Sequence, residues 1–169
     1  WRDWSSDVCS SDLLFAFIGM LIIGMVERKS DFTLVVGSFG ATAVLLYDAI
    51  KSPLAQPRNV VGGHVISGLV GVGCRYVFDS GMRNGYIQNH TDLWHVGVGS
   101  LSVSLAIVFM GVTGTTHPPG GATALIAVMG PPAMVELGIW YVVHPVFVGA
   151  CVLVLVAVVL NNKIGRAHV

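Results

Sequence analysis

The sequence carries little charge for its length. Of its 169 residues only 11% are charged, whereas 54% are hydrophobic, and nine Lys and Arg balance nine Asp and Glu. Soluble domains average about 25% charged residues, so this chain has too few charges to cover a water-exposed surface. The zero net charge gives no reason to expect nucleic acid as a partner. We therefore expect an integral membrane protein, an all-α polytopic helix bundle whose main partner is the lipid bilayer.

The sequence also lacks the patterns that mark common cofactor, metal and catalytic sites. The three cysteines (Cys9, Cys74 and Cys151) are scattered, and no His, Cys, Asp or Glu residues have metal-ligand spacing. Neither a phosphate-binding loop, nor a dinucleotide fingerprint, nor a nucleophile elbow occurs. We expect no cofactor, no metal and no enzymatic activity.

The two ends of the chain differ abruptly from the sequence between them. Residues 1–13 are polar and unpatterned, and from Asp3 to Leu13 they match the translation of a sequencing adapter. Residues 163–169 match adapter sequence in the same way. Such segments are set aside in fold reasoning. We expect residues 14–162 to be the natural transmembrane domain, with a first helix that is truncated.

Apolar segments separated by polar or proline-containing loops divide this domain. A membrane-spanning helix needs about 20 mostly apolar residues. The segments are 14–26, 32–50, 60–78, 94–112, 121–129 and 139–160. The fifth is short because Gly130-Pro131-Pro132 ends it. The pattern predicts about six spans, with a broken or short fifth helix.

A short motif occurs twice. Gly40-Ala41-Thr42-Ala43 and Gly121-Ala122-Thr123-Ala124 are 81 positions apart, and a histidine follows each motif after 24 and 23 positions, His64 and His144. Three spans in each half would turn one half upside down relative to the other, as in the inverted repeats of many secondary transporters. The halves would be residues 14–78 and 94–160. A chance match in a chain rich in Gly and Ala is the alternative.

Helix starts within an apolar chain are candidate sites for a small anion. Unpaired N–H groups and the helix dipole place partial positive charge there, and glycine permits close approach. If the repeat is inverted, two such starts meet near the middle of the membrane. The candidate residues are Ser38, Gly40, Thr42, Thr116, Gly120, Gly121 and Thr123. Tight helix packing and turn geometry explain the same glycines equally well.

One arginine and three histidines complete the candidate site. Arg58 and Asn59 precede the third apolar segment, where an arginine either attracts anions into a vestibule or extends to the membrane surface. His64, His117 and His144 lie in or beside apolar segments. A histidine there would donate to an anion or relay a proton. The alternative for each is a neutral packing residue.

Two blocks of sequence resemble the HPP family of integral membrane proteins. The first is Thr116 to Ala124, which contains the eponymous His117-Pro118-Pro119, and the second combines Gly37–Leu45 with Ser52–His64. The family is bacterial and plant, and its plastid members are linked to nitrite transport. The resemblance implies a permease for a small anion, with nitrite as the candidate, and we expect a bacterial inner (plasma) membrane location.

The leading hypothesis is therefore a permease for a small inorganic anion. In it, Arg58 would recruit the anion, the glycine-rich helix starts would bind it, and the histidines would supply donors. The alternative is a membrane sensor or scaffold, in which the broken helix serves packing or partner binding. A homo-oligomer is compatible with either hypothesis.

Overall fold

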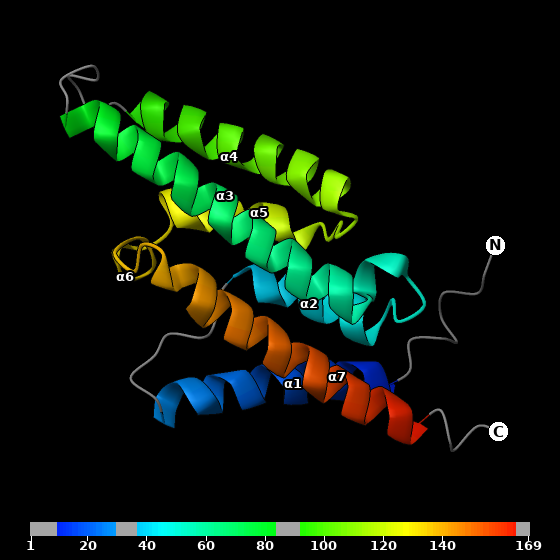
Figure 1. Cartoon of the computed structure of the whole chain (residues 1–169). Helices are drawn as coiled ribbons and strands as arrows, with labels where there is room; N and C mark the ends of the chain where they lie inside the picture. The colour runs from blue at the N-terminus through cyan, green and yellow to red at the C-terminus, as the bar shows by residue number, and fades with distance from the viewer. Residues whose placement is uncertain (1–9, 30–36, 84–91, 165–169) are drawn as a thin grey trace.

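The described residues form a helix bundle in the computed structural model, which covers residues 10–29, 37–83 and 92–164 (Figure 1). Its elements are α1 (Ser10–Lys29), α2 (Ser38–Tyr47), the 3₁₀ turn η1 (Pro53–Ala55), α3 (Pro57–Arg83), α4 (Asp92–Thr113), α5 (Pro119–Met129), α6 (Pro132–Val135), the π-helical segment η2 (Val142–Phe147) and α7 (Val148–Ile164). Within these ranges there is no strand. The predicted all-α membrane bundle is confirmed.

Within the described ranges, three helical stretches are long and apolar enough to cross a membrane. They are Pro57–Ser80, His95–Thr113 and Val142–Leu160, close to the third, fourth and sixth predicted segments. Leu14–Met25, Ser38–Tyr47 and Pro119–Met129 are shorter apolar helices. The second predicted segment is thus helical only from Ser38 to Tyr47, and its residues 32–36 lie outside the described ranges.

Proline and glycine set the ends of the short helix α5. Pro119 occupies its first position, where the missing N–H removes no helical hydrogen bond. At the other end, Gly130 is extended (φ −69°, ψ 177°), and Pro131 and Pro132 follow. The short fifth helix that the sequence predicted is therefore present, with bounds two residues wider at its start.

The last predicted segment is divided rather than continuous. His144 leaves the helical region (φ −161°, ψ 116°), and Pro145 cannot donate a backbone hydrogen bond. The chain passes through η2 before α7 begins at Val148. The helix is consequently kinked at His144-Pro145, near the start of the predicted segment, and the apolar run after the kink is continuous in α7.

A row of small residues on α3 lets α5, and the segment before α5, pack closely against α3. Gly63, Ser67 and Gly71 follow one another at four-residue spacing, on one face of the helix. A Cβ at Gly63 would lie 2.6 Å from the Cβ of His117, and one at Gly71 would lie 2.5 Å from the Ala124 carbonyl oxygen. Small residues therefore let these backbones approach, as membrane helices commonly require.

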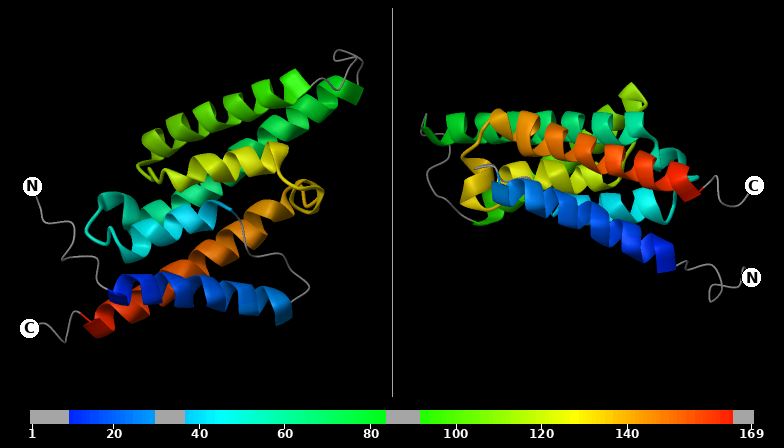
Figure 2. Two further views of the ribbon diagram at one scale, coloured as in Figure 1. Left: turned by 180° about the vertical axis from the view of Figure 1, so that it is seen from behind. Right: turned by 90° about the horizontal axis from the view of Figure 1, so that it is seen from below.

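One face of α2 packs against the neighbouring helices. Helix α2 contacts α1, α5 and α7, and α7 in turn contacts α1 and α3. Figure 2 shows α2 and α5 between the pair α3–α4 and the pair α1–α7. Phe39 and Tyr47 of α2 and Leu153 of α7 are buried in this core. One face of α2 and one face of α5 are buried, so polar groups on these inner faces are shielded from the surroundings.

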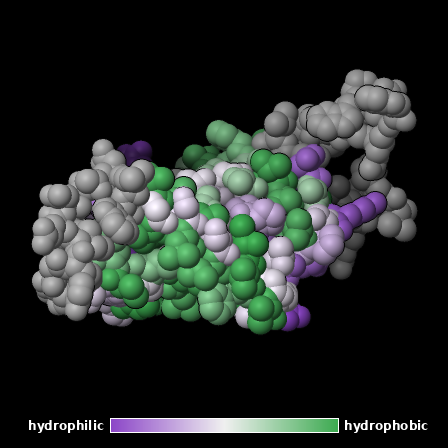
Figure 3. Space-filling view, turned by 90° about the horizontal axis from the view of Figure 1, so that it is seen from above, coloured by the Kyte–Doolittle hydropathy of each residue, from purple (hydrophilic) through white to green (hydrophobic). Residues whose placement is uncertain are grey.

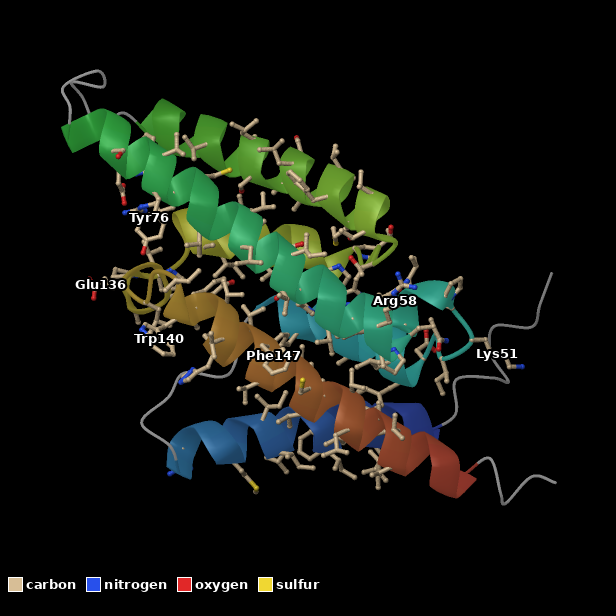
Figure 4. The ribbon with its side chains drawn as sticks, viewed as in Figure 1. Lys51, Arg58, Tyr76, Glu136, Trp140 and Phe147 are labelled. Carbon is tan, nitrogen blue, oxygen red and sulfur yellow. The ribbon has the colours of Figure 1, made fainter. Side chains whose placement is uncertain are left out.

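Apolar side chains cover much of the outside. On α4 the exposed large hydrophobic residues are Val96, Leu101, Ile107, Val108, Phe109 and Val112. Figure 3 shows hydrophobic residues over the middle of one face. In Figure 4, Lys51 and Arg58 lie near one end of the bundle and Tyr76 and Glu136 near the other. An apolar surface of this extent suits contact with lipid, with charged groups toward the two ends.

Candidate functional site

The short helices α2 and α5 begin beside each other and run in opposite directions (Figure 2). Ser38, the first residue of α2, lies with its Oγ 2.8 Å from Oγ1 of Thr123 on α5. One turn further along α2, Oγ1 of Thr42 lies 3.1 Å from Nε2 of His117, which precedes α5. From the first pair to the second, the residue number rises along α2 and falls along the α5 segment. The first turns of the two helices therefore cross antiparallel.

Five polar side chains meet at this crossing, and each is at most 1% exposed. We call them the histidine–hydroxyl network: Ser38, Thr42, His64, His117 and Thr123. They come from α2, α3, the segment before α5, and α5 itself. A buried polar group is costly unless it is hydrogen-bonded, and these groups satisfy one another.

His64 is the centre of the network. Thr42 Oγ1 lies 2.8 Å from its Nε2, and Thr123 Oγ1 lies 2.7 Å from its Nδ1. Both ring nitrogens therefore have a threonine hydroxyl as partner. The two threonines occupy the same position of the two Gly-Ala-Thr-Ala motifs. The Phe39 ring packs edge-on against the imidazole, with centroids 5.2 Å apart.

His117 terminates the network at a backbone group. Its Nδ1 lies 2.9 Å from the carbonyl oxygen of Leu54 in η1. A carbonyl can only accept a hydrogen bond, so this nitrogen carries a hydrogen and donates. The ring centroid lies 4.9 Å from that of His64. Because the tautomer of His117 is fixed by Leu54, its Nε2 faces Thr42 as an acceptor whenever the ring is neutral.

Close backbone contacts hold His117 in place. A Cβ at Gly120 would lie 2.6 Å from Ser67 Oγ and 3.0 Å from the Gly63 carbonyl oxygen. Ser67 is fully buried, and its hydroxyl donates to Met110 Sδ at 3.4 Å. The chain before α5 therefore fits against α3 and α4 only because these positions are small.

A pocket of about 160 Å³ lies toward the other end of α5, and residues of α3, α5, α6 and the start of the last helix line it. Tyr141 lines this pocket and donates its hydroxyl to the Thr123 carbonyl oxygen at 2.9 Å. Tyr76 and Glu136, which Figure 4 labels, line it as well. The pocket thus approaches the Thr123 side of the network through Tyr141.

Arg75 belongs to the same pocket and connects two helices. Its Nε donates to Asp79 at 2.9 Å, and its Nη1 donates to the Val128 carbonyl oxygen at 3.0 Å. A cation at the C-terminus of α5 is favourable for the helix dipole. Among the described residues, no three His, Cys, Asp or Glu side chains are placed to hold a metal ion together.

Arg58 and Asn59 lie outside the network. Arg58 is exposed, and its Nη2 donates to the carbonyl oxygen of Thr113, the last residue of α4, at 3.2 Å (Figure 4). Asn59 donates to the Pro53 carbonyl oxygen at 3.0 Å. Both side chains therefore connect the start of α3 to neighbouring segments.

The other predicted residues also lie apart from the network. Gly40 and Thr116 are exposed, whereas Gly121 is buried near Val103. His144 is half-buried in η2, and none of the hydrogen bonds that join the network includes it. The structure thus brings together five of the twelve candidates and places Gly120 directly beside them.

The first backbone N–H groups of α5 are already engaged. Gly120 N–H donates to the His117 carbonyl oxygen at 2.9 Å, and Gly121 N–H donates to that of Pro118 at 3.0 Å. The prediction that these N–H groups bind an anion would require them to exchange partners. The polar chemistry at the crossing is supplied by side chains.

Three participants were not anticipated from the sequence. Ser67 could have been found, because it lies midway between Gly63 and Gly71 in the row of small residues on α3. The Leu54 carbonyl and the Tyr141 hydroxyl had no comparable signal, since each contact depends on tertiary placement.

Comparison with known proteins agrees with this architecture. The profile of the family described as HPP, transmembrane region, matches residues 4–168. Two transmembrane proteins of Dictyostelium discoideum are similar: one is 42% identical over 155 residues (88% of this chain, 46% of the relative), the other 37% identical over 153 residues (88% and 50%). The chain spans about half the length of these relatives. No solved structure matches it.

Proposed function

The chain belongs to the HPP family of transmembrane proteins, and on that basis we propose that it is a permease for a small inorganic anion, with nitrite as the leading candidate. The observation that carries this proposal is the histidine–hydroxyl network, buried where two short helices cross inside an apolar bundle. Irregular or broken helices at membrane depth are where transporters hold small polar solutes.

The side chains of the network suit an anion that accepts several short hydrogen bonds. Hydroxyl groups can rotate to donate, and a neutral imidazole donates through one nitrogen. Thr42 and Thr123 flank His64 at 2.8 and 2.7 Å. An anion that entered here would replace hydrogen bonds within the network. The hydroxyl and imidazole donors that lose a partner in the network would then donate to the anion.

In this proposal Arg58 attracts the anion toward the network. Its guanidinium is exposed at one end of the bundle, and a Cβ at Gly114 would lie 3.5 Å from its Nη2. The segment that begins with Gly114 leads directly to His117. A positive charge at this end of the bundle would raise the local concentration of anions.

Nitrite uptake into proteoliposomes tests the proposal. The protein is reconstituted, an inward nitrite gradient is applied at neutral pH, at which nitrite is almost wholly ionised, and internal nitrite is measured after rapid quenching. We expect uptake above that of empty liposomes. His117→Ala and Arg58→Ala should reduce it, while Ser104→Ala, which removes an exposed hydroxyl on α4, should not. Uptake no greater than in empty liposomes would overturn the permease.

One observation favours the second candidate function, a membrane scaffold or sensor. The network satisfies its own hydrogen bonds, as a purely structural polar core would. A scaffold predicts normal folding and no flux of nitrite, nitrate or chloride. The same uptake measurement therefore separates the two functions.

A further inference from the structure

The contacts of the network can be satisfied by a chain of hydrogen bonds that all point in one direction. His117 Nδ1 donates to Leu54, so in a neutral ring Nε2 accepts the hydrogen of Thr42. Thr42 Oγ1 has only that one hydrogen, so it accepts from Nε2–H of His64. This arrangement uses the 2.8 and 3.1 Å contacts of Thr42 in preference to its 3.2 Å contact with the Ser38 carbonyl oxygen.

The other half of the chain follows by the same reasoning. A neutral His64 with hydrogen on Nε2 accepts at Nδ1, so Thr123 donates to it. In this arrangement the Ser38 hydroxyl donates to Thr123 Oγ1, 2.8 Å away. The positions of the heavy atoms favour the opposite direction, from Thr123 to Ser38, which is the direction in the second arrangement below. In this first arrangement every contact between Ser38 and Leu54 contains one hydrogen, and both imidazoles are neutral.

A second arrangement contains one more proton and also satisfies every contact. If a proton is added at Ser38 Oγ, each hydrogen moves one place along the chain. The Ser38 hydrogen moves to Thr123, that of Thr123 to His64 Nδ1, that of His64 Nε2 to Thr42, and that of Thr42 to His117 Nε2. No bond is left without a hydrogen. One proton enters at Ser38, and the positive charge appears on His117, between Thr42 and the Leu54 carbonyl.

We propose that the histidine–hydroxyl network is a binding site for a single proton, which it conducts between Ser38 and His117. At one end, the backbone carbonyl of Thr123 accepts from Tyr141, which lines the pocket. The other end, His117 and Leu54, is on the side of Arg58. The chain of hydrogen bonds thus extends from one side of the crossing to the other.

The surroundings of the two rings limit the site to one proton. Their centroids are only 4.9 Å apart, so charge on both at once would be strongly repulsive in this buried setting. The groups in contact with the two histidines are the Phe39 ring, the hydroxyls of Thr42 and Thr123, the Leu54 carbonyl oxygen and, beside the His117 Cβ, Gly63 of α3. In these contacts the only titratable neighbours are the two histidines themselves and, through the Thr123 carbonyl, Tyr141.

The role of this proton rests on the proposed function. A monovalent anion is expensive to bury, and a protonated His117 beside it would neutralise the pair. The permease would therefore carry anion and proton together, with His117 as the charge partner. If the chain proves not to be a permease, the proton site itself is unaffected.

Nitrogen-15 NMR of histidine-labelled protein in lipid bilayers tests the site without any transport. His64→Gln and His117→Gln variants assign the signals. At alkaline pH we expect His64 to be protonated on Nε2 and His117 on Nδ1. On acidification, His117 should become doubly protonated while His64 stays neutral and changes its protonated nitrogen from Nε2 to Nδ1. An unchanged tautomer of His64, or simultaneous charging of both rings, would overturn the proposal.

Two substitutions of Thr42, one without and one with a hydroxyl, test whether the proton passes through this residue. Thr42→Val keeps the shape of the side chain but interrupts the chain of hydrogens, so acidification should no longer change the His64 tautomer. Thr42→Ser keeps the hydroxyl and should preserve the change. Loss of the change in both variants, or its survival in Thr42→Val, would contradict conduction through Thr42.

Proton movement measured during nitrite uptake separates the two proposals. A pH-sensitive dye inside the liposomes should report proton uptake that accompanies nitrite in wild type and in Thr42→Ser. Nitrite uptake without proton movement would retain the permease and refute co-transport. The NMR change without nitrite uptake would retain the proton site and refute the permease.

Discussion

Thr42 and Thr123, 81 positions apart in the sequence, hydrogen-bond to the two nitrogens of one imidazole, Nε2 and Nδ1 of His64, at 2.8 and 2.7 Å. They are the corresponding threonines of the two Gly-Ala-Thr-Ala motifs, and they lie on helices that cross antiparallel. An inverted repeat would generate this symmetry, and it stays a prediction. The relationship makes His64 the point where both halves of the chain meet.

Because both threonines act through His64, their contributions to stability should not be additive. Thr42→Val and Thr123→Val should each lower the free energy of unfolding by about 1–2 kcal/mol, since each leaves a buried imidazole nitrogen without its partner. The double variant should lose less than the sum, with a coupling of about 0.5 kcal/mol or more. Unfolding by SDS in mixed micelles measures all three. Strict additivity would show that His64 does not connect the two sites.

The close approach of α3 to the segment before α5 predicts a contrast between two glycines of one helix. Gly63→Ala should destabilise the protein by about 1–3 kcal/mol, because the new Cβ meets His117 and the Thr115 carbonyl. Gly73 has no heavy atom within 4 Å of such a Cβ. Gly73→Ala should be neutral or stabilise by up to about 1 kcal/mol, through helix propensity. The same unfolding measurement compares them, and equal losses would contradict the packing.

The helix pattern and the break before α5 could be predicted from the sequence, because both depend on residues close together along the chain. Long apolar runs predict spans, and Pro118, Pro119 and Gly130-Pro131-Pro132 limit α5 from both sides. Small residues on the apolar helices indicate close helix contacts, and Gly71 and Gly99 both lie against a neighbouring helix, at Ala124 and Met129.

The sequence predicted only some of the contacts within the histidine–hydroxyl network. The repeat indicated that Thr42 and Thr123 would be near each other, but it paired His64 with His144. Residue 144 instead falls at the kink in η2, where Pro145 interrupts the helix. The second imidazole in contact with Thr42 is that of His117, 75 positions away, and spacing alone could not predict it. The contact between His117 and the Leu54 carbonyl depends on the path of the chain through η1, which the sequence does not indicate.

Arg58 should affect transport more than folding. Its side chain is exposed and donates a hydrogen bond to the Thr113 carbonyl oxygen, so Arg58→Gln should change the free energy of unfolding by less than about 1 kcal/mol. Nitrite uptake at low ionic strength should fall by up to about tenfold, because the attraction of anions is lost. The difference from wild type should shrink as salt is added. A deficit independent of salt would argue against electrostatic recruitment.

Tyr141 should act on stability through the Thr123 backbone. Tyr141→Phe removes one buried hydrogen bond, to the Thr123 carbonyl, at a cost of about 1 kcal/mol. The threonine hydroxyl still contacts His64, so the His64 tautomer change in the NMR titration should persist. Loss of that change in Tyr141→Phe would mean that the phenol belongs to the proton chain.

Nitrite uptake per folded protein, compared between wild type, Thr42→Ser and Thr42→Val in matched proteoliposomes, tests the central claim most directly. The network is predicted to bind the anion through its hydroxyls, so Thr42→Ser should retain most of the uptake and Thr42→Val should lose it, with both variants folded. Equal uptake by Thr42→Val and wild type would contradict the account.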